Sequence, residues 1–530
     1  METIEELRAF VAAATKDEVW GRLLYRGAAW ALMRTDGELP PDAPSLGESI
    51  ETDLAEHGFA LLRAALALLE REGPSSLASK GFERSANAFE SLVRNGAPNA
   101  VERGFHRTLA GSCYHLAGFS AVAYSLFNQH EEAQNNNPAE VAVVLLILRD
   151  LDRLRGHVQA WLRDAAHGDE TLALWLESEQ IEADDAVATI LNTTICRALA
   201  HFDFALQTGE AELVDRARQL LGGAIDLAAN AENVPLWWLG KVCRALVDDL
   251  WSHSLHVRLP VNGPEEGAED YPRLRGLFIA SLYARKTAEV ELWPSQREAA
   301  TRAVDLADDL VVALPTSAGK TRVAEIATLM TRSVRKRVLI VTPLRALSAQ
   351  MERSFRKTFA PLGFNVSSLY GASGVSAGDE DALRLRDIVI ATPEKLDFAL
   401  RNDASLIDDV GLIVLDEGHM IGPTEREIRY ETLVQRLLRR GDADQRRIVC
   451  LSAVLPGGEE LDDLTAWVRS DKQGNAVRSD WRPTRQRFGT LVWAGGAARL
   501  NYDLNNDGPF VGRFVAAMAP RRPDRTPYPG

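Results

Sequence analysis

The chain has 530 residues, of which 46% are hydrophobic, and a formal net charge of −15. This length suggests two or three domains with full hydrophobic cores. The acidic balance argues against a protein that coats nucleic acid through bulk charge. It leaves room for a local basic groove, because binding follows patches rather than totals.

The cysteines and the N-terminus bear on the cellular compartment. The four cysteines are far apart, form no CxxC pair and stand in apolar or helical contexts, so buried free thiols are expected rather than metal ligands or disulfides. The first residues are acidic, and no apolar run approaches the length of a membrane span. A cytoplasmic location is therefore expected.

Residues 1–258 are predicted to form an all-α domain. Leu, Ala and Val recur there at three- and four-residue spacing, as in residues 59–69, and turn formers such as those at 73–76 interrupt the pattern. Small residues between 110 and 124 favour the close approach of stacked helices, and this stretch faintly resembles a tetratricopeptide unit. No fixed period can be established, so a weak helical repeat and an irregular bundle both stay open.

The best domain boundary follows this helical region. Acidic residues and turn formers over 260–267 replace the helical pattern. Residues 259–289 are therefore predicted to be a linker and a lead-in helix, which runs from about Arg273 to Lys286.

Residues 290–490 change in character, because short β-rich apolar runs alternate there with helical segments. This alternation predicts an α/β domain, a parallel sheet with helices on both faces. The predicted strands are residues 310–314, 337–341, 365–369, 387–391, 411–415 and 447–451. Nearly every run ends at a polar sequence, and an open α/β sheet binds its ligands at the carboxyl ends of its strands.

The first of these runs leads into a candidate phosphate-binding loop. Residues 311–321 read as a strand, a tight turn and a helix start, which is the layout of such a loop. Its expected phosphate-contacting residues are Pro315, Thr316, Ser317, Ala318 and Gly319. Lys320 is expected to reach the β- and γ-phosphates, and Thr321 to offer its hydroxyl to Mg²⁺. Leu314 stands where this motif usually has its first glycine, and a plain helix N-terminus with a surface lysine is the alternative for the loop alone.

The fifth run ends at Asp416-Glu417-Gly418-His419. An aspartate at the end of an apolar strand can hold Mg²⁺ directly or through water. An adjacent glutamate can deprotonate the water that attacks a γ-phosphate. For this tetrapeptide alone an acidic loop end is the simpler interpretation, but a phosphate loop upstream in the same sheet favours the catalytic one.

Taken together, residues 290–490 resemble one RecA-like domain of a superfamily-two DExH-box helicase, most closely the Ski-type subgroup. The residues that carry the resemblance are 315–321 (motif I), 342–347 (Ia), 391–396 (Ib), 416–419 (II) and 451–456 (III). Trp293-Pro294-Ser295-Gln296 is similar to the adenine-recognition motif that lies upstream in such helicases. Val454 departs from the usual Ser-Ala-Thr of motif III.

The resemblance implies a role for each matching position, with ATP and Mg²⁺ as the cofactors. Gln296 would read the adenine edge, and Thr321 and Asp416 would hold the metal. Lys320, Asp416, Glu417 and His419 would form the catalytic set, with Glu417 as the base. Ser452 and Ala453 would couple the nucleotide site to the strand. The nucleic-acid backbone would be contacted by Thr342, Pro343, Arg345, Thr392 and Lys395.

The resemblance also implies that this chain is the ATP-binding half of a helicase or translocase that acts on DNA or RNA. Residues 491–530 are expected to begin an inter-domain segment and to end in a disordered tail, so a second RecA-like domain or chain would be the partner. A bacterial phage-defence helicase, present here as a fragment, is a further expectation. The alternative is a non-catalytic helical scaffold with a regulatory nucleotide-binding module, against which the intact Lys320-Thr321 and Asp416-Glu417 pairs argue.

Overall fold

The chain divides into two compact units. The computed structural model describes residues 3–16, 48–95, 102–129, 137–164, 183–263, 268–369, 383–453, 458–483, 489–494, 497–502 and 510–511. The first unit comprises Met1–Asp203, Ala211–Asp249 and Pro483–Gly530, and the second comprises Phe204–Glu210 and Leu250–Arg482. The division therefore falls earlier than the boundary at residue 258 that the sequence suggested. No helix within the described ranges combines the length and the apolarity needed to cross a bilayer.

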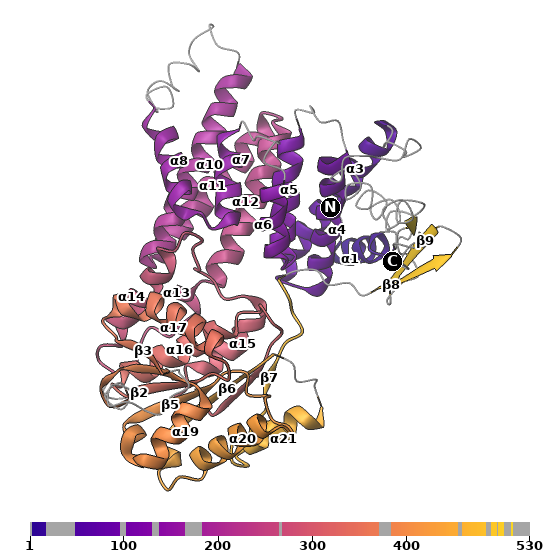
Figure 1. Ribbon diagram of the computed structural model, residues 1–530. Helices are drawn as coiled ribbons and strands as arrows, with labels where there is room; N and C mark the ends of the chain where they lie inside the picture. The colour runs from indigo at the N-terminus through magenta and orange to yellow at the C-terminus, as the bar shows by residue number, and fades with distance from the viewer. Residues whose placement is uncertain are drawn as a thin grey trace, which may run out of the picture. The chain divides into compact units, whose positions relative to one another are not determined.

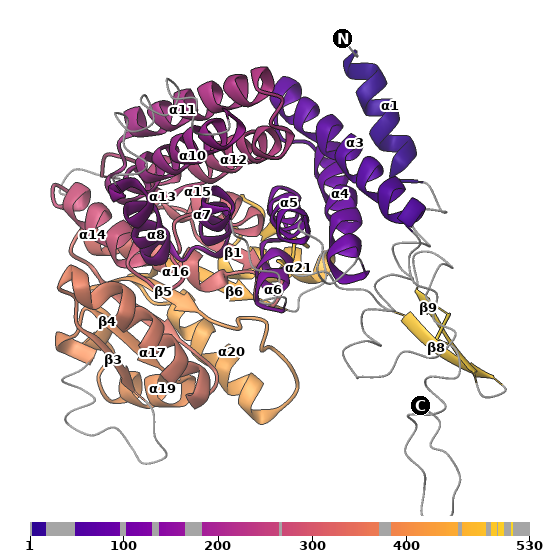
Figure 2. The same ribbon diagram turned by 90° about the horizontal axis from the view of Figure 1, so that it is seen from above.

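The first unit is built mainly of helices. They are α1 (Ile4–Ala14), α3 (Glu48–Glu72), α4 (Ser76–Asn95), α5 (Arg103–Leu116), α6 (Ser120–Gln129), α7 (Pro138–Leu148), α8 (Leu151–Arg163), α10 (Ala183–Thr208), α11 (Ala211–Asn230) and α12 (Val234–Ser252). Helices α3, α4 and α5 pack in succession. Figures 1 and 2 agree in placing α10, α11 and α12 next to one another. The predicted all-α character of this region is confirmed.

Local sequence explains where these helices begin and how closely they approach. The side chain of Asn137 accepts hydrogen bonds from the N–H groups of Ala139 and Glu140, so it caps the start of α7. A Cβ at Gly111 would overlap the ring of Phe127. The small residue at position 111 therefore lets α5 pack closely against α6, as the stretch 110–124 predicted.

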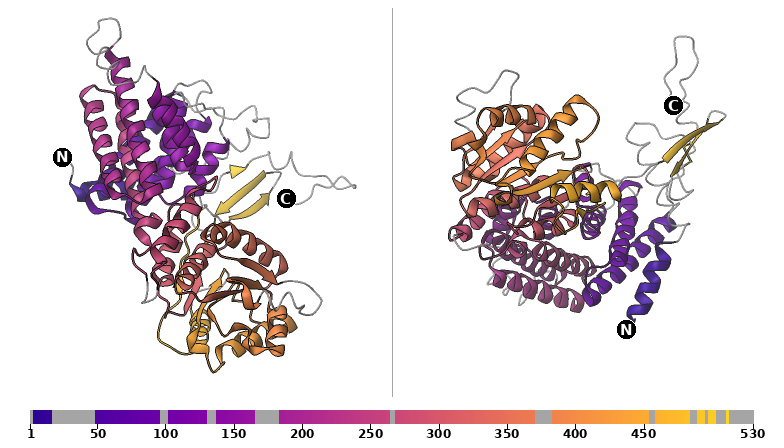
Figure 3. Two further views of the ribbon diagram at one scale, coloured as in Figure 1. Left: turned by 90° about the vertical axis from the view of Figure 1, so that its left-hand side faces the viewer. Right: turned by 90° about the horizontal axis from the view of Figure 1, so that it is seen from below.

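A small antiparallel sheet also belongs to the first unit. Its strands are β8 (Gly489–Ala494), β9 (Ala497–Tyr502) and β10 (Phe510–Val511), in the order β10-β9-β8, and Figure 3 shows β8 and β9 as a pair of yellow arrows. Paired strands stand where the sequence analysis expected the start of an inter-domain segment. The arginine-rich end of the chain, expected to be a disordered tail, lies outside the described residues.

The second unit contains a seven-stranded parallel sheet, in the order β3-β4-β2-β5-β6-β1-β7. The strands are β1 (Leu310–Ala313), β2 (Arg337–Val341), β3 (Val366–Leu369), β4 (Ile388–Ala391), β5 (Val410–Leu415), β6 (Arg447–Ser452) and β7 (Val477–Arg478). The six predicted strands are confirmed to within one residue at each end. Strand β7 was not predicted. The predicted fold class, an α/β RecA-like sheet preceded by a helical domain, is confirmed.

Helices cover both faces of this sheet. They are α13 (Leu255–Arg258), α14 (Tyr271–Tyr283), α15 (Pro294–Ala303), α16 (Lys320–Ser333), α17 (Arg345–Phe359), α19 (Pro393–Asn402), α20 (Glu425–Leu438) and α21 (Glu459–Val468). Helices α14 to α17 share one hydrophobic cluster with one face of the strands, and α19 to α21 share a second cluster with the other face. Because both faces are buried, the strands read as continuous apolar runs.

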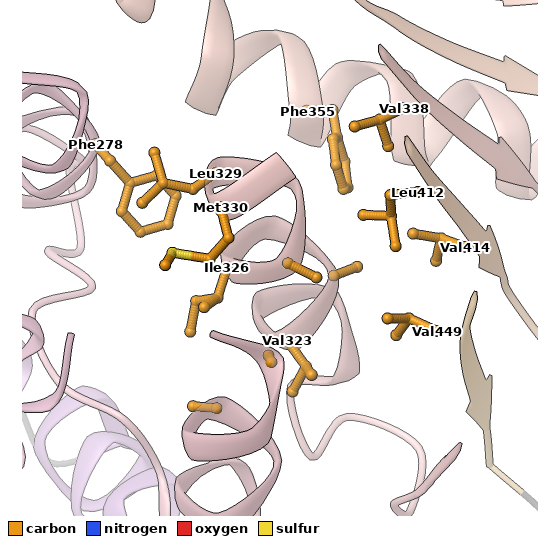
Figure 4. Close-up of a cluster of buried hydrophobic side chains, with 14 of the residues drawn as sticks. Phe278, Val323, Ile326, Leu329, Met330, Val338, Phe355, Leu412, Val414 and Val449 are labelled. Carbon is orange, nitrogen blue, oxygen red and sulfur yellow. The ribbon is translucent and has the colours of Figure 1, made fainter. Parts of the chain in front are cut away.

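Helix α16 lies at the centre of the first cluster. Its side chains Ile326, Leu329 and Met330 lie between Phe278 of α14 and Leu412 of β5 (Figure 4). The lead-in helix that the sequence placed in a linker is therefore packed into the core of the second unit. Because the phosphate loop leads directly into α16, the packing of α14 against α16 also positions that loop.

Candidate functional site

The loop between β1 and α16 is shaped to hold an anion. Gly319, just before α16, has φ +84°, and a Cβ there would overlap the amide of Gln296. Ser317 also has a positive φ of 64°. Within the part of the chain that the structure describes, no side chain caps the start of α16. The N–H of Arg322 already donates to the carbonyl of Gly319 at 3.1 Å, so the N–H groups of Lys320 and Thr321 are the first-turn donors that can face phosphate oxygens, and the residues fit the predicted nucleotide phosphates.

Two neighbouring side chains hold this loop in place. Ser295 Oγ donates to the carbonyl of Ala318 at 2.9 Å, and Gln296 Nε2 donates to the carbonyl of Gly319 at 3.0 Å. Gln296 Oε1 accepts from the N–H of Trp293 at 2.8 Å. Both ends of the Gln296 amide therefore have partners inside the protein, which leaves one N–H for the expected contact with adenine. The role of Ser295 was not predicted.

The acidic loop after β5 is held by backbone bonds to two neighbouring strands. The N–H of Asp416 donates to the carbonyl of Val341 at the end of β2, and the N–H of Gly418 donates to the carbonyl of Leu451 in β6, both at 2.9 Å. A Cβ at Gly418 would overlap Sγ of Cys450. This packing brings Glu417 Oε1 to 3.9 Å from Lys320 Nζ, so the two predicted halves of the nucleotide site meet.

The charges in this loop fit a divalent cation. Asp416 is 8% exposed. Burial, together with the neighbouring carboxylate of Glu417, raises the pKa of Asp416 to about 6, although Lys320 opposes the shift. Burial lowers the pKa of Lys320, whereas both carboxylates oppose that change. A buried carboxylate that repels its neighbour gains from a bound cation, and oxygen ligands from Asp416 and Thr321 suit Mg²⁺.

His419 of the acidic loop contacts Ser452, the last residue of β6, which pairs with β1. Ser452 Oγ is 3.3 Å from His419 Nδ1, which is itself 3.5 Å from Glu417 Oε2. The carbonyl of Ser452 accepts from the N–H of Leu314 at the start of the phosphate loop, at 3.1 Å. These contacts link the acidic loop to β6 and, through β6, to the start of the phosphate loop. Ala453 follows Ser452, whereas Val454, the departure in motif III, lies outside the described residues.

At the edge that was expected to contact a nucleic-acid strand, the structure differs from the prediction. Of the five residues expected there, all of them described, Arg345 alone is exposed. The four buried ones are Thr342, Pro343, Thr392 and Lys395. The hydroxyl of Thr342 is paired with that of Ser348. Side-chain contacts from these buried residues do not fit the structure, because they face the protein interior.

Helix starts offer a different kind of contact at this edge. Helices α17 and α19 begin directly after β2 and β4, and their N-cap residues Leu344 and Thr392 make no side-chain cap bond within the described chain. Backbone N–H groups in their first turns can donate to a phosphate, although Pro393, the first residue of α19, has no N–H.

Sequence reasoning also missed two residues on α20. Arg426 donates to the carbonyl of Pro343 and, over 3.2 Å, to Glu394. Tyr430 is buried, and its hydroxyl finds no partner among the described residues. The capping box of Thr424 and Glu427 is a readable signal that places Arg426 in the first turn of α20. The partners of Arg426 are 32 and 83 residues away, and no local pattern indicates them.

Comparison with known proteins gives the relationships of this region. Residues 293–464 match the DEAD/DEAH box helicase family. The chain is 29% identical to the Hachiman protein HamB of Bacillus cereus over 328 residues, which cover 61% of this chain and 28% of HamB. It is 37% identical to the ATP-dependent DNA helicase Hel308 of Pyrococcus abyssi over 250 residues, 44% of this chain and 32% of Hel308. For Hel308 of Pyrococcus horikoshii the identity is 33% over 209 residues, 39% of this chain and 27% of the relative.

The match spans less than a third of the length of each of these relatives. The match to HamB extends beyond the helicase region, since it covers more of the chain than residues 293–464. Residues 293–464 are a DEAD/DEAH box helicase domain, homologous to parts of Hel308 and of HamB.

Proposed function

We propose that the second unit binds and hydrolyses Mg·ATP as the ATP-binding half of a nucleic-acid helicase or translocase of the Ski-type DExH subgroup, acting in the cytoplasm. The observation that carries this proposal is the approach of Lys320 Nζ to Glu417 Oε1, 3.9 Å apart, at the carboxyl ends of β1 and β5. The homology of residues 293–464 to helicases supports the nucleic-acid part.

The residues divide the chemistry among them. The amides of the loop that ends at Gly319 hold the phosphates, and Lys320 supplies a cation to the terminal one. Thr321 and Asp416 are the ligands for Mg²⁺, which when bound screens the charge that develops on the phosphate oxygens. Glu417 orients the attacking water and accepts its proton. The contact between His419 and Ser452 passes the state of this site to β6.

Strand binding is proposed at the carboxyl ends of β2 and β4. Backbone N–H groups in the first turns of α17 and α19 and the guanidinium of Arg345 bind backbone phosphates there. Such contacts carry no sequence information, so binding is weak, independent of sequence and sensitive to salt. The relatives named Hel308 are DNA helicases, which makes single-stranded DNA the first ligand to test.

A second RecA-like domain, in this chain or another, completes the motor in this proposal. Arginines that such a domain presents to the γ-phosphate can be worth about 10³–10⁵ in rate. A site without them is also open to water, which weakens electrostatic stabilisation of the transition state. The 530 residues alone are therefore expected to bind ATP weakly and to hydrolyse it near the background rate. The similarity to HamB of Bacillus cereus over 61% of the chain supports the bacterial part of the setting expected above, and the phage-defence role is part of this proposal.

Calorimetry with a non-hydrolysable ATP analogue tests the nucleotide site. Lys320→Ala should abolish binding, because the phosphates lose their positioned side-chain cation. Lys286→Ala, which removes an exposed lysine from the same unit, is the matched control. Unchanged affinity in the Lys320 variant would refute the assignment of this loop as the phosphate-binding loop.

Turnover tests the proposed need for a second domain. Supplying that domain should raise hydrolysis, and Glu417→Gln should remove the increase while leaving analogue binding intact. Robust strand-stimulated hydrolysis by the purified chain alone would contradict the half-motor proposal.

A further inference from the structure

Tyr430, in the second turn of α20, is buried on the side of the sheet that carries the acidic loop's packing partner Cys450. Its side chain is 2% exposed, and its hydroxyl has no hydrogen-bond partner among the described residues. It shares a hydrophobic cluster with Cys450 of β6 and with Leu415, the last residue of β5. A Cβ at Gly418 would overlap Sγ of Cys450, so this sulfur lies against the acidic loop. Cys450 thereby connects Tyr430 to the acidic loop through packing.

The acidic loop also acts on the Tyr430 hydroxyl through its charge. Burial raises the pKa of Tyr430 well above its ordinary value, and the thiol of Cys450 and the carboxylates of Asp416 and Glu417 raise it further. The hydroxyl therefore keeps its proton at neutral pH and is a hydrogen-bond donor. A buried donor without an acceptor costs free energy, and a charged acceptor makes the stronger bond. The two carboxylates are acceptors of that kind.

Lys320 compensates the charge of these carboxylates in the structure. Its Nζ lies 3.9 Å from Glu417 Oε1, and its charge opposes the rise that burial causes in the pKa of Asp416. A bound ATP would draw the same ammonium toward its phosphates. The Asp416 carboxylate would then depend on Mg²⁺ and on other donors. It offers about four acceptor sites, of which the N–H of Glu417 occupies one.

We propose that Tyr430 is a positioning residue of the nucleotide site, whose hydroxyl donates to the Asp416 carboxylate when this carboxylate holds Mg²⁺. Carboxylates that bind a metal are themselves hydrogen-bonded by further groups, which orient them. The inference rests on the proposed function, because it needs Mg·ATP at the site. It assigns Tyr430 an action through Asp416 and no contact with the metal or the nucleotide.

The alternative is a tyrosine ring that only fills the core. Tyr430→Phe keeps the ring and removes the hydroxyl, so it separates the two interpretations. If the hydroxyl gains its partner only with the metal, this variant should be at least as stable as the wild type without nucleotide, yet should bind Mg·ATP more weakly. If the ring only fills the core, the variant should bind Mg·ATP as the wild type does.

Tyr271→Phe is the matched control. Tyr271 of α14 is buried in the same unit, and its hydroxyl already donates to the carbonyl of Pro260 at 2.9 Å. Loss of this bond should lower the unfolding temperature. The affinity for nucleotide should stay unchanged, because Tyr271 packs away from the acidic loop in the other hydrophobic cluster.

The first measurement is thermal unfolding of the full chain in a metal chelator without nucleotide. Tyr430→Phe should unfold at the temperature of the wild type or up to about 4 °C above it, because an unpartnered buried hydroxyl has been removed. Tyr271→Phe should unfold below the wild type. An unfolding temperature of Tyr430→Phe below that of the wild type would show that the hydroxyl already has a partner, which overturns the inference.

The second measurement is calorimetry with a non-hydrolysable ATP analogue. With Mg²⁺ present, Tyr430→Phe should weaken binding about tenfold, the equivalent of one hydrogen bond to a charged group. With a chelator in place of Mg²⁺ the same change should cost less than about twofold. In the Glu417→Gln background the tenfold loss with Mg²⁺ should persist, because Asp416 is unchanged there.

Each other outcome has a distinct meaning. Absence of analogue binding by the wild-type chain refutes the proposed function itself. Wild-type binding that Tyr430→Phe leaves unchanged refutes the inference and leaves the proposed function standing. An equal loss with and without Mg²⁺ shows a general packing effect, and a loss that vanishes in the Glu417→Gln background shows that Glu417 is the partner. Either result overturns the assignment of Tyr430 to Asp416.

Discussion

Replacing Asp416 by asparagine should make the metal-free protein more stable at neutral pH. Burial and the Glu417 carboxylate raise the pKa of Asp416 from 3.8 to about 6 in the folded chain. The folded state then binds this proton more tightly than the unfolded state does. Stability contributed by the protonated carboxyl is present below about pH 4 and is lost as the pH rises through about 6. At pH 7 and above, the wild type bears the full free-energy cost of an ionised Asp416 in its buried position.

The size of the effect follows from the shift. About two pKa units correspond to a ceiling of about 3 kcal/mol. This shift already includes the favourable interaction with Lys320, but the new amide must itself be hydrogen-bonded in a buried place. The expected gain for Asp416→Asn is therefore about 1–3 kcal/mol at pH 7.5, or about 2–4 °C in the unfolding temperature for each kcal/mol.

The assay is thermal unfolding with a metal chelator present, at several pH values from 4.5 to 8. The gain of Asp416→Asn over the wild type should shrink steadily as the pH falls. Asp463→Asn, which removes an exposed carboxylate from α21, should show no such gain. With Mg²⁺ and an ATP analogue the wild type should become more stable than Asp416→Asn, because only the wild type offers the carboxylate ligand. A variant less stable than the wild type at pH 8, or a gain that does not depend on pH, would refute the reasoning.

Two glycines give further tests of the site. Gly319→Ala places a Cβ on the Gln296 amide at a positive φ, so affinity for an ATP analogue, measured by calorimetry, should fall by more than about tenfold, in the manner of other small misplacements at active sites. Gly441→Ala, where a Cβ meets no described atom within 4 Å, should leave that affinity unchanged. Gly418→Ala should lower the unfolding free energy by about 1–3 kcal/mol through its overlap with Cys450. Cys450→Ala in the same chain should recover most of that loss in denaturant unfolding, and failure to recover it would show that this overlap is not the cause.

The sequence predicted the sheet well because its strands are buried on both faces. Five of the six predicted strands are apolar runs, whereas β3 contains Ser367 and Ser368, and nearly every run is followed by polar residues; this pattern is local. Strand β7 was missed because it has two residues, Val477 and Arg478, and pairs only with β1. Two residues carry no periodicity, so this strand is defined only by its neighbour.

The nucleotide side of the site was predicted better than the strand side, for a physical reason. Phosphate and metal ligands follow their strands directly, so the motif residues and the chemistry coincide. Lys395 was expected to contact the nucleic-acid backbone, yet it lies on the face of α19 that also buries Leu396 and Ala399. Arg426 and its partners Pro343 and Glu394 come from three separate segments, and only the fold brings them together.

The backbone bond from Asp416 to Val341 has a mechanical consequence. The carboxylate proposed to hold the metal and the loop that begins at Thr342 are attached to adjoining peptides, because β2 and β5 are paired up to their last residues. A displacement of one loop would therefore move the other through the backbone, without any relay of side chains. Insertions just after β2 or β5 would lengthen one of these loops and weaken this backbone coupling. Insertions at the opposite edge of the sheet would cost only the slowly growing entropy of a longer loop.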